Sequence, residues 1–332
     1  MEKVEHYPSK ERKENVFMIE IFMTKDEDFS QINTYEEGSW IALTDPSATE
    51  LLEVSERFEI DVDHLRAALD EEERSRIEIE DTYTLIVVDI PSVEESDGKD
   101  KYITIPMAII ITDTNIITVC LEDTTVLKSF KDGRVKEFYT FKKTRFILQI
   151  LYRNATVFLQ YLRVIDRKSE EIESTLHKSP KNTKNKELIS MLELEKSLVY
   201  FSTSLRANEV VLEKLLRTKN IKQYPEDTEL LEDVIVENKQ AIEMSGIYTG
   251  ILSSMTDSVA SIISNNLNNV MKFTATVTIV MSIPTIIASF YGMNVGGIHP
   301  GMDNPYAFVG VILGSIGISG LVAFVLAKLD MF

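Results

Sequence analysis

Two long uncharged segments near the C-terminus constrain the fold more than any other feature of the sequence. Residues 273–298 contain no charged side chain, and neither do residues 304–327. Each segment exceeds the ~20 residues that an α-helix needs to cross a hydrocarbon core about 30 Å thick. The turn between them is too short for a domain. We therefore expect a membrane hairpin, with nearly all of the preceding chain on one side of the bilayer.

The few charges that flank these segments predict their orientation. Lys272 precedes the first segment and Lys328 follows the second, whereas the turn between them carries Asp303. The positive-inside rule then places both termini in the cytoplasm of a multi-pass protein of the cell (inner or plasma) membrane. Cys120 is the only cysteine, which suits a reducing cytosol. The first residues have no apolar core, so we expect no signal peptide.

Nearly all of the formal net charge of −18 resides in the part of the chain before the membrane segments. A strongly acidic surface argues against nucleic acid as a partner, because phosphate binding needs a basic face. Divalent cations are the natural counter-species of such a surface. Ordinary solubility is the alternative interpretation of the charge.

Residues 1–140 have the pattern of a mixed α/β domain. Short helices are expected after Pro46 and over residues 62–69. Runs of β-branched and aromatic residues of strand length occur at 16–23, 40–43, 83–90, 103–111 and 115–121.

Helical periodicity replaces the strand pattern after about residue 140. Apolar residues recur at spacings of three and four over 144–177 and 184–218, with a polar break around Pro180. This predicts an acidic helical hairpin within residues 141–224. A last helix begins at Pro225, with acidic residues in its first turn, and no strong breaker precedes Pro284. Residues 225–291 are therefore expected to form one stalk helix that continues into the first membrane span.

Small and weakly polar residues form a stripe along this first membrane helix. They alternate at three- and four-residue spacing, which places them on one helix face. The stripe either packs helices together in lipid or lines a water-filled path made by several copies of the helix. Both interpretations require an oligomer. The residues of the stripe are Ser264, Asn268, Met271, Ala275, Thr278, Ser282, Thr285 and Ser289.

Three segments of the chain resemble the CorA family of magnesium and cobalt transport proteins. The sequence Tyr-Gly-Met-Asn at 291–294 ends the first of two C-terminal spans, as in that family. Residues 40–46 resemble the family's first strand and turn, and residues 76–83 resemble the segment that leads into its next strand. The resemblance covers essentially the whole chain.

The resemblance implies a fold and an assembly. The fold is an α+β cytosolic domain with an acidic helical hairpin, a long stalk helix and two C-terminal transmembrane helices, assembled as a funnel-shaped homopentamer in the lipid bilayer. The division that follows is 1–140 for the α/β domain, 141–224 for the hairpin, 225–291 for the stalk and pore helix, 292–305 for the outer loop, and 306–332 for the second transmembrane helix and tail.

The resemblance also implies residue roles. Gly292, Met293 and Asn294 would form the selectivity filter, with the Asn294 amide oxygens facing the hydration shell of the incoming ion. Asp233 and Asp257 would hold regulatory Mg²⁺ between subunits and so close the channel when cytosolic Mg²⁺ is high. Within the stripe, Asn268, Met271, Ala275, Thr278, Ser282, Thr285 and Ser289 would line the pore.

The sequence departs from the family pattern at three places. Arg66 and Ala67 stand where family members often carry an acidic pair that faces the stalk. The C-terminus lacks the usual cluster of lysines. The outer loop has no glutamate, and its sequence Asn-Val-Gly-Gly-Ile at 294–298 resembles that of the ZntB zinc-transporting branch of the same superfamily.

These observations predict a divalent-cation channel for Mg²⁺ uptake. A transporter of Zn²⁺, Co²⁺ or Ni²⁺ from the same superfamily is the first alternative. A membrane-anchored cation sensor that does not conduct is the second. We expect no enzyme, because the sequence has four histidines, no glycine-rich phosphate loop and no nucleophile–base motif.

Overall fold

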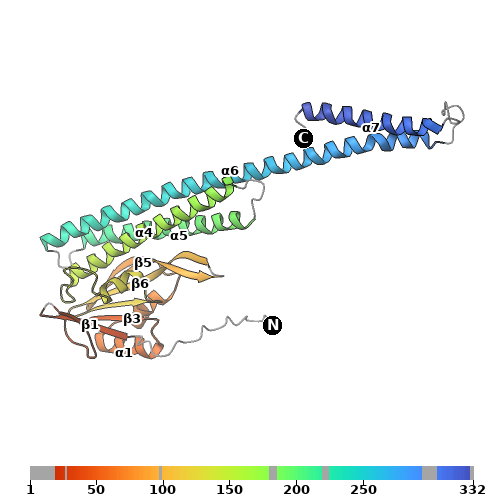
Figure 1. The fold of residues 1–332 in the computed structure, drawn as a ribbon. Helices are drawn as coiled ribbons and strands as arrows, with labels where there is room; N and C mark the ends of the chain where they lie inside the picture. Colours follow the sequence, from red (N-terminus) through yellow and green to blue (C-terminus); the bar gives the residue numbers. More distant parts are fainter. Residues whose placement is uncertain are drawn as a thin grey trace. The chain divides into compact units, whose positions relative to one another are not determined.

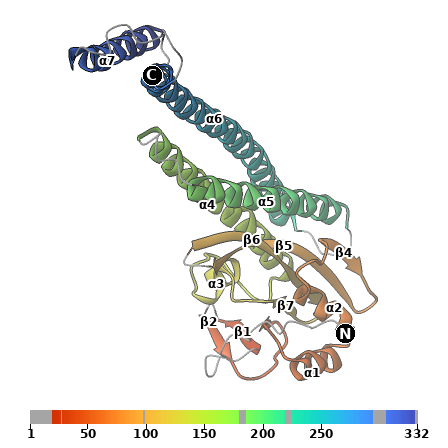
Figure 2. The same ribbon diagram turned by 90° about the vertical axis from the view of Figure 1, so that its right-hand side faces the viewer.

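The computed structural model describes residues 19–26, 28–96, 99–178, 185–218, 224–293 and 305–329. The chain divides into two compact units. The first comprises residues 1–174 and 186–253, and the second comprises residues 175–185 and 254–332. Figure 1 gives the course of the chain and Figure 2 a second view.

A mixed β-sheet is the centre of the first unit. Its seven strands in the described residues have the order β2-β1-β3-β7-β6-β5-β4. All neighbours pair antiparallel except β3 and β7, which are parallel. The strands are β1 (Ile19–Lys25), β2 (Asp28–Ile32), β3 (Trp40–Thr44), β4 (Arg76–Ile79), β5 (Tyr83–Ser96), β6 (Lys99–Thr112) and β7 (Ile116–Cys120).

Both faces of this sheet are buried, and β3 shows how one strand contributes to each. Trp40 and Ala42 belong to one apolar cluster, whereas Ile41 and Leu43 belong to the other, because successive side chains of a strand point to opposite faces. The Trp40 cluster packs against α3 (Thr125–Lys131) and the long helices. The Ile41 cluster packs against α1 (Ala48–Phe58), α2 (Val62–Arg66) and the short 3₁₀ helix η1 (Ala67–Leu69).

Three long helices cover the Trp40 side of the sheet, as Figure 1 shows. They are α4 (Lys143–Lys178), α5 (Asn185–Arg217) and the first part of α6 (Pro225–Tyr291). Phe158 of α4 meets Phe201 of α5 edge-on, with ring centroids 5.1 Å apart. Buried polar groups connect α6 to α5: Asn238 Nδ2 donates to the Leu205 carbonyl at 3.1 Å, and Ser245 Oγ donates to the Leu198 carbonyl at 3.2 Å.

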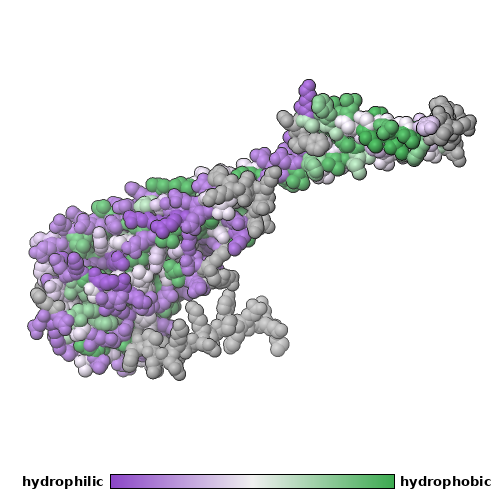
Figure 3. Space-filling model, viewed as in Figure 1, coloured by the Kyte–Doolittle hydropathy of each residue, from purple (hydrophilic) through white to green (hydrophobic). Residues whose placement is uncertain are grey.

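The second unit contains the apolar end of α6 and α7 (Pro305–Lys328). By length and composition, α6 and the Phe308–Lys328 part of α7 could each cross a membrane. The surface of these helices is predominantly apolar, which Figure 3 shows as green patches separated by white and pale residues. The prediction of two C-terminal candidate spans is confirmed.

Most of the elements expected from the sequence are present, and the described residues contain three further elements that were not expected. The five predicted strands correspond to β1, β3, β5, β6 and β7, and the prediction of one helix over residues 225–291 is confirmed. The helix predicted over 62–69 is interrupted, since α2 ends at Arg66 and η1 follows it. Strands β2 and β4 and helix α3 are additions that the apolar pattern did not predict.

Candidate ion pathway

The polar stripe of the first membrane helix lies on the uncovered surface of α6. Within the second unit, Met271 is 63% exposed, and the other members from Asn268 to Ser289 are exposed or half-exposed. By contrast, Thr276 on another face of the same helix is fully buried. The single chain therefore covers the Thr276 face of the helix and leaves the stripe exposed, together with apolar residues such as Phe273 and Met281.

Helix α7 supplies the cover for the buried face. Ser315 and Ser319, one turn apart on α7, are each only 9% exposed. Figure 1 draws α7 running back along the end of α6, and both segments belong to the second unit. Small residues at such a contact allow helices in a bilayer to approach closely. The buried positions in the apolar parts of α6 and α7 are thus small polar residues outside the stripe, and the stripe itself is exposed.

The hydroxyl groups of the stripe bond to the helix that carries them. Thr278 Oγ1 donates to the Thr274 carbonyl at 2.8 Å, Ser282 Oγ donates to the Ile279 carbonyl at 2.8 Å, and Thr285 Oγ1 donates to the Met281 carbonyl at 3.1 Å. Each hydroxyl hydrogen is thereby used within the helix, which removes an unsatisfied donor from the apolar region. The oxygen lone pairs stay free to accept hydrogen bonds. This part of the stripe presents acceptors, which suit the water molecules around a cation.

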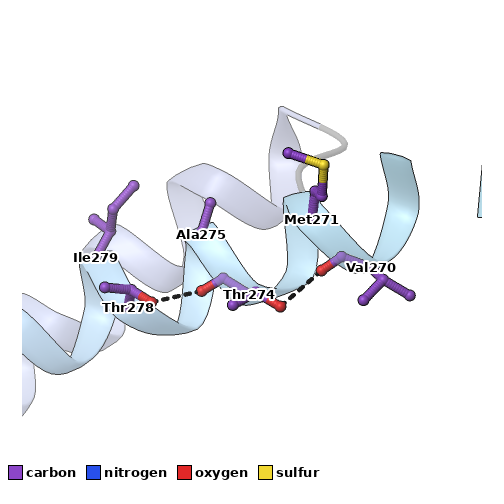
Figure 4. A pocket seen from close by; sticks show the side chains of 6 residues that line it. All are labelled: Val270, Met271, Thr274, Ala275, Thr278 and Ile279. Carbon is purple, nitrogen blue, oxygen red and sulfur yellow. Dashed lines mark hydrogen bonds between the residues drawn. The ribbon is translucent and has the colours of Figure 1, made fainter. Parts of the chain in front are cut away.

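Part of the stripe lines a shallow hollow on α6, drawn in Figure 4. Met271, Ala275 and Thr278 of the lining come from the stripe. Thr274 also lines the hollow, and its hydroxyl donates to the Val270 carbonyl at 2.8 Å. The lining carries no charge. The hollow therefore offers oxygen atoms and apolar surface, but no group that would bind a bare cation tightly.

The first two residues of the Gly-Met-Asn motif lie at the end of α6. Gly292 and Met293 follow the last helical residue, and the Gly292 N–H donates to the Ala288 carbonyl at 3.0 Å. A methyl group on Gly292 would make ordinary contacts with the carbonyl oxygens of Ala288 and Ser289, at 3.4 and 3.6 Å. The helix itself therefore does not require glycine here. Asn294 and the rest of the predicted outer loop lie outside the described residues.

The two predicted regulatory carboxylates are exposed side chains of α6. Asp233 belongs to the first unit and Asp257 to the second. Both side chains are exposed to solvent in the single chain. At the departure from the family pattern, Arg66 forms an ion pair with Asp63 at 3.3 Å, and Ala67 is buried. This segment does not supply the acidic pair.

A buried polar cluster between the sheet and the long helices was missed by the sequence reasoning. Its centre is Asp89 of β5, whose backbone is held by side-chain amides from α4 and α5. Burial raises the pKa of the Asp89 carboxyl above its usual value, against the opposing effect of hydrogen bonds from Ser204 and Ser75. An aspartate in an otherwise apolar strand was the available signal.

Comparison with known proteins identifies a family and several relatives. The family described as CorA-like Mg²⁺ transporter protein matches residues 35–328. The cobalt/magnesium transport protein CorA of Methanocaldococcus jannaschii is 30% identical over 275 residues, which cover 81% of this chain and 83% of the relative.

Solved structures give the same family and extend the fold likeness. The complete structure of the CorA magnesium transporter from M. jannaschii has a TM-score of 0.78 at 25% identity, covering 95% of this chain and 98% of that one. The ZntB cytoplasmic domain from Vibrio parahaemolyticus has a TM-score of 0.59 at 12% identity, covering 75% and 99%, and shows a likeness of fold alone. The two C-terminal candidate spans, the mixed α+β unit, the long helix and the match over residues 35–328 together establish that this chain belongs to the CorA-like Mg²⁺ transporter family.

Proposed function

We propose that this chain assembles as a homopentamer and conducts hydrated divalent cations, with Mg²⁺ uptake as its principal activity. The observation that carries the proposal is the uncovered stripe of α6, since α7 buries the Thr276 face and leaves Thr278 and its neighbours exposed. A single hairpin cannot enclose a path. Several copies arranged around the stripe would enclose one lined by Asn268, Met271, Ala275, Thr278, Ser282, Thr285 and Ser289.

The chemistry of this lining suits an ion that keeps its water. Mg²⁺ loses its hydration shell reluctantly and is usually bound with several waters retained. Those waters donate hydrogen bonds, and the hydroxyl oxygens of the stripe are free to accept them because their hydrogens are already bonded within the helix. A neutral lining also holds the ion weakly enough for it to leave.

Asn294, with Gly292 and Met293, is the proposed filter at the outer end of this path. A ring of amide oxygens can hydrogen-bond a hydration shell without a fixed charge, so it would select hydrated cations without trapping them. The position of Gly292 and Met293 directly after α6 supports this assignment.

The choice among ions follows from the donor types. The stripe contains no His or Cys, which Zn²⁺ prefers as ligands. The relative from M. jannaschii is named a cobalt/magnesium transport protein, which supports Mg²⁺ and Co²⁺ as transported ions. Transport of Zn²⁺, Co²⁺ or Ni²⁺ as the principal ion is the alternative within the same class.

Regulation by cytosolic Mg²⁺ is proposed at Asp233 and Asp257. Carboxylates from closely packed copies of the chain would repel one another, and a bound Mg²⁺ would relieve that repulsion. Binding would favour the closed state, and loss of Mg²⁺ would release the subunits.

The proposed topology has both termini in the cytoplasm. Residues 1–140 and 141–224 are the soluble domains, 225–291 the stalk and pore helix, and 292–305 the outer loop.

A membrane-anchored cation sensor is the rival function. In that case the hairpin only anchors and oligomerises, and the polar stripe serves helix packing. An anchor gains nothing from a ring of asparagines at its outer end, which is the reason to prefer conduction.

Ion flux into proteoliposomes tests the proposal. Mg²⁺, Co²⁺ and Zn²⁺ should be offered separately to the unmodified protein, to Asn294→Ala and to His299→Ala, a control in the same predicted loop. We expect Mg²⁺ influx that Asn294→Ala reduces or makes unselective and that His299→Ala leaves unchanged. Absence of flux for every divalent ion would favour the sensor. Unaltered flux and selectivity in Asn294→Ala would remove the filter assignment.

A further inference from the structure

One histidine and two glutamates converge where helix α2 meets the β4 edge of the sheet. His64 lies on α2, Glu78 on β4, and Glu80 directly after β4. One ligand atom from each of the three side chains lies within 4.8 Å of those from the other two. His64 and Glu78 are half-buried, and Glu80 is exposed. Because Glu78 and Glu80 are two residues apart in extended chain, their side chains point to the same face.

The separation of these atoms is close to the one that a bound metal ion requires. His64 Nε2 lies 3.1 Å from Glu78 Oε2. An ion with bonds of about 2.0–2.2 Å to nitrogen and oxygen places neighbouring ligand atoms about 2.9–3.5 Å apart in octahedral or tetrahedral geometry. The His64–Glu78 pair already has this spacing, and an oxygen of the exposed Glu80 carboxylate lies within 4.8 Å of both ligand atoms.

Tyr83 fixes the histidine ring in the orientation that metal binding needs. Its Oη lies 2.7 Å from His64 Nδ1 and accepts a hydrogen bond from the Asp61 N–H at 3.2 Å. If His64 Nδ1 carries the proton and donates it to Tyr83, Nε2 presents its lone pair toward the carboxylates. Metal-binding histidines are commonly held by such a partner on the second ring nitrogen.

Arg76 is the cation that faces the same cluster, and it leaves the binding oxygen free. Its Nε bonds Glu78 Oε1, its Nη1 bonds Glu73 Oε1 at 2.6 Å, and Glu78 Oε2 remains directed at His64. The hydrogen bond from Arg76 lowers the pKa of the Glu78 carboxyl below its usual value, against the smaller effect of desolvation. The Glu78 oxygen that faces His64 is thus a different atom from the one that Arg76 binds.

We propose that His64, Glu78 and Glu80 bind a first-row transition-metal ion of the Co²⁺, Ni²⁺ or Zn²⁺ type on the soluble unit of each chain, with water in the remaining positions. Imidazole together with carboxylate favours these ions, whereas Mg²⁺ prefers oxygen ligands alone. All three ligands come from one chain, so the site differs from the proposed regulatory site at Asp233 and Asp257. It does not depend on the proposed conduction.

Binding at this site would link α2 to the edge of the sheet. His64 is in a five-residue helix, and both glutamates belong to the β4 edge. The metal ion would add a cross-link between two elements that otherwise meet through the His64–Glu78 contact and packing. Hydrogen exchange of the α2 amides should therefore slow when Co²⁺ binds.

Titration of Co²⁺ into the metal-free, full-length protein in detergent tests the proposal. Visible absorption reports ligand type and geometry, and calorimetry reports affinity and the number of sites. Glu80→Gln removes the exposed ligand with little risk to the fold, and Asp81→Asn removes the same charge at the next residue. We expect Glu80→Gln to weaken one Co²⁺ site per chain at least ~10-fold, while Asp81→Asn changes it less than about 2-fold.

A second variant tests the role of the imidazole. His64→Gln should abolish the absorption change of that site even if its metal-free melting temperature falls, whereas a tenfold excess of Mg²⁺ should leave Co²⁺ bound to the unmodified protein. Equal weakening by Glu80→Gln and Asp81→Asn would reduce the cluster to a nonspecific acidic surface and overturn the proposal. Retention of every Co²⁺ site in both His64→Gln and Glu80→Gln would overturn it as well.

Discussion

The side-chain amide of Asn208 forms hydrogen bonds with both backbone polar groups of Asp89. Asn208 Oδ1 accepts from the Asp89 N–H at 2.9 Å, and Asn208 Nδ2 donates to the Asp89 carbonyl at 2.7 Å. On the edge of β5 that faces β4, the Tyr83 carbonyl accepts a hydrogen bond from the Glu80 N–H. The backbone N–H and C=O groups of every second residue of β5, counted from Tyr83 and therefore including Asp89, face this edge. Strand β4 begins at Arg76, paired with Val87, and gives Asp89 no partner. The Asn208 side chain supplies the backbone hydrogen bonds that a longer β4 would have made to Asp89.

Replacement of Asn208 by alanine should loosen the contact between β5 and α5. The Asp89 N–H would be left buried without its acceptor, at a cost of about 1–3 kcal/mol. The Asp89 carbonyl would keep its hydrogen bond from Asn154 Nδ2 at 2.9 Å. We expect a lower melting temperature and faster hydrogen exchange at Asp89, measured by scanning fluorimetry and mass spectrometry.

Glu213→Ala, an exposed substitution on the same helix, serves as the control for Asn208→Ala. It should leave both the melting temperature and the exchange of β5 unchanged. Equal effects of the two substitutions would mean that the amide of Asn208 does not hold the strand.

Replacement of Asp89 by asparagine should stabilise the protein at neutral pH. Burial raises the pKa of Asp89, so folding favours its protonated form. In the unfolded chain this carboxyl has a pKa of about 3.9. The contribution of Asp89 to the free energy of unfolding is fully present below that pH and is lost as the pH rises through the higher pKa of the folded state. Asparagine stays neutral throughout, and the backbone bonds to Asn208 remain.

The melting temperatures of Asp89→Asn and the unmodified protein, measured from pH 4 to pH 8, give the outcome. We expect the variant to melt higher at pH 7 and the difference to shrink toward pH 4. A difference that is independent of pH would contradict the account of the buried charge.

The match between sequence and structure depends on how strongly burial marks each element. β7 is buried at every residue, and its apolar run predicts a strand correctly. β2 (Asp28–Ile32) is a half-exposed edge strand of mostly polar residues, so pairing with β1, and not its own composition, determines it. β4 is likewise a short edge strand, fixed by its pairing with β5.

The candidate sites divide in the same way. The stripe of α6 could be predicted because it repeats along a single helix, where spacing alone places residues on one face. The cluster of His64, Glu78 and Glu80 could not be predicted, since His64 and Glu78 belong to different elements and meet only through the fold. The alternation of Glu78 and Glu80 was the one local signal. The cover of Thr276 by α7 also needs the tertiary structure.

Substitution of Asp233 by alanine should weaken the proposed regulation by Mg²⁺. If Asp233 binds Mg²⁺ between subunits, added Mg²⁺ should protect the unmodified protein from limited proteolysis, and the variant should need a higher concentration for the same protection. Glu232→Ala is the matched control, because Glu232 is an adjacent exposed carboxylate on the same helix. Identical Mg²⁺ dependence in Asp233→Ala and the unmodified protein would remove Asp233 from the site.

Divalent cations are proposed to pass along the stripe of α6, and Mg²⁺ influx into proteoliposomes tests this passage most directly. The comparison is between the unmodified protein, Thr278→Leu on the stripe, and Val277→Leu at the adjacent position off the stripe. Leucine at position 278 replaces a hydroxyl that can accept hydrogen bonds with a bulkier apolar group. We expect influx to fall at least ~10-fold in Thr278→Leu and to change less than about 2-fold in Val277→Leu. Equal influx for Thr278→Leu and the unmodified protein, or no Mg²⁺ influx for any of the three, would contradict the account.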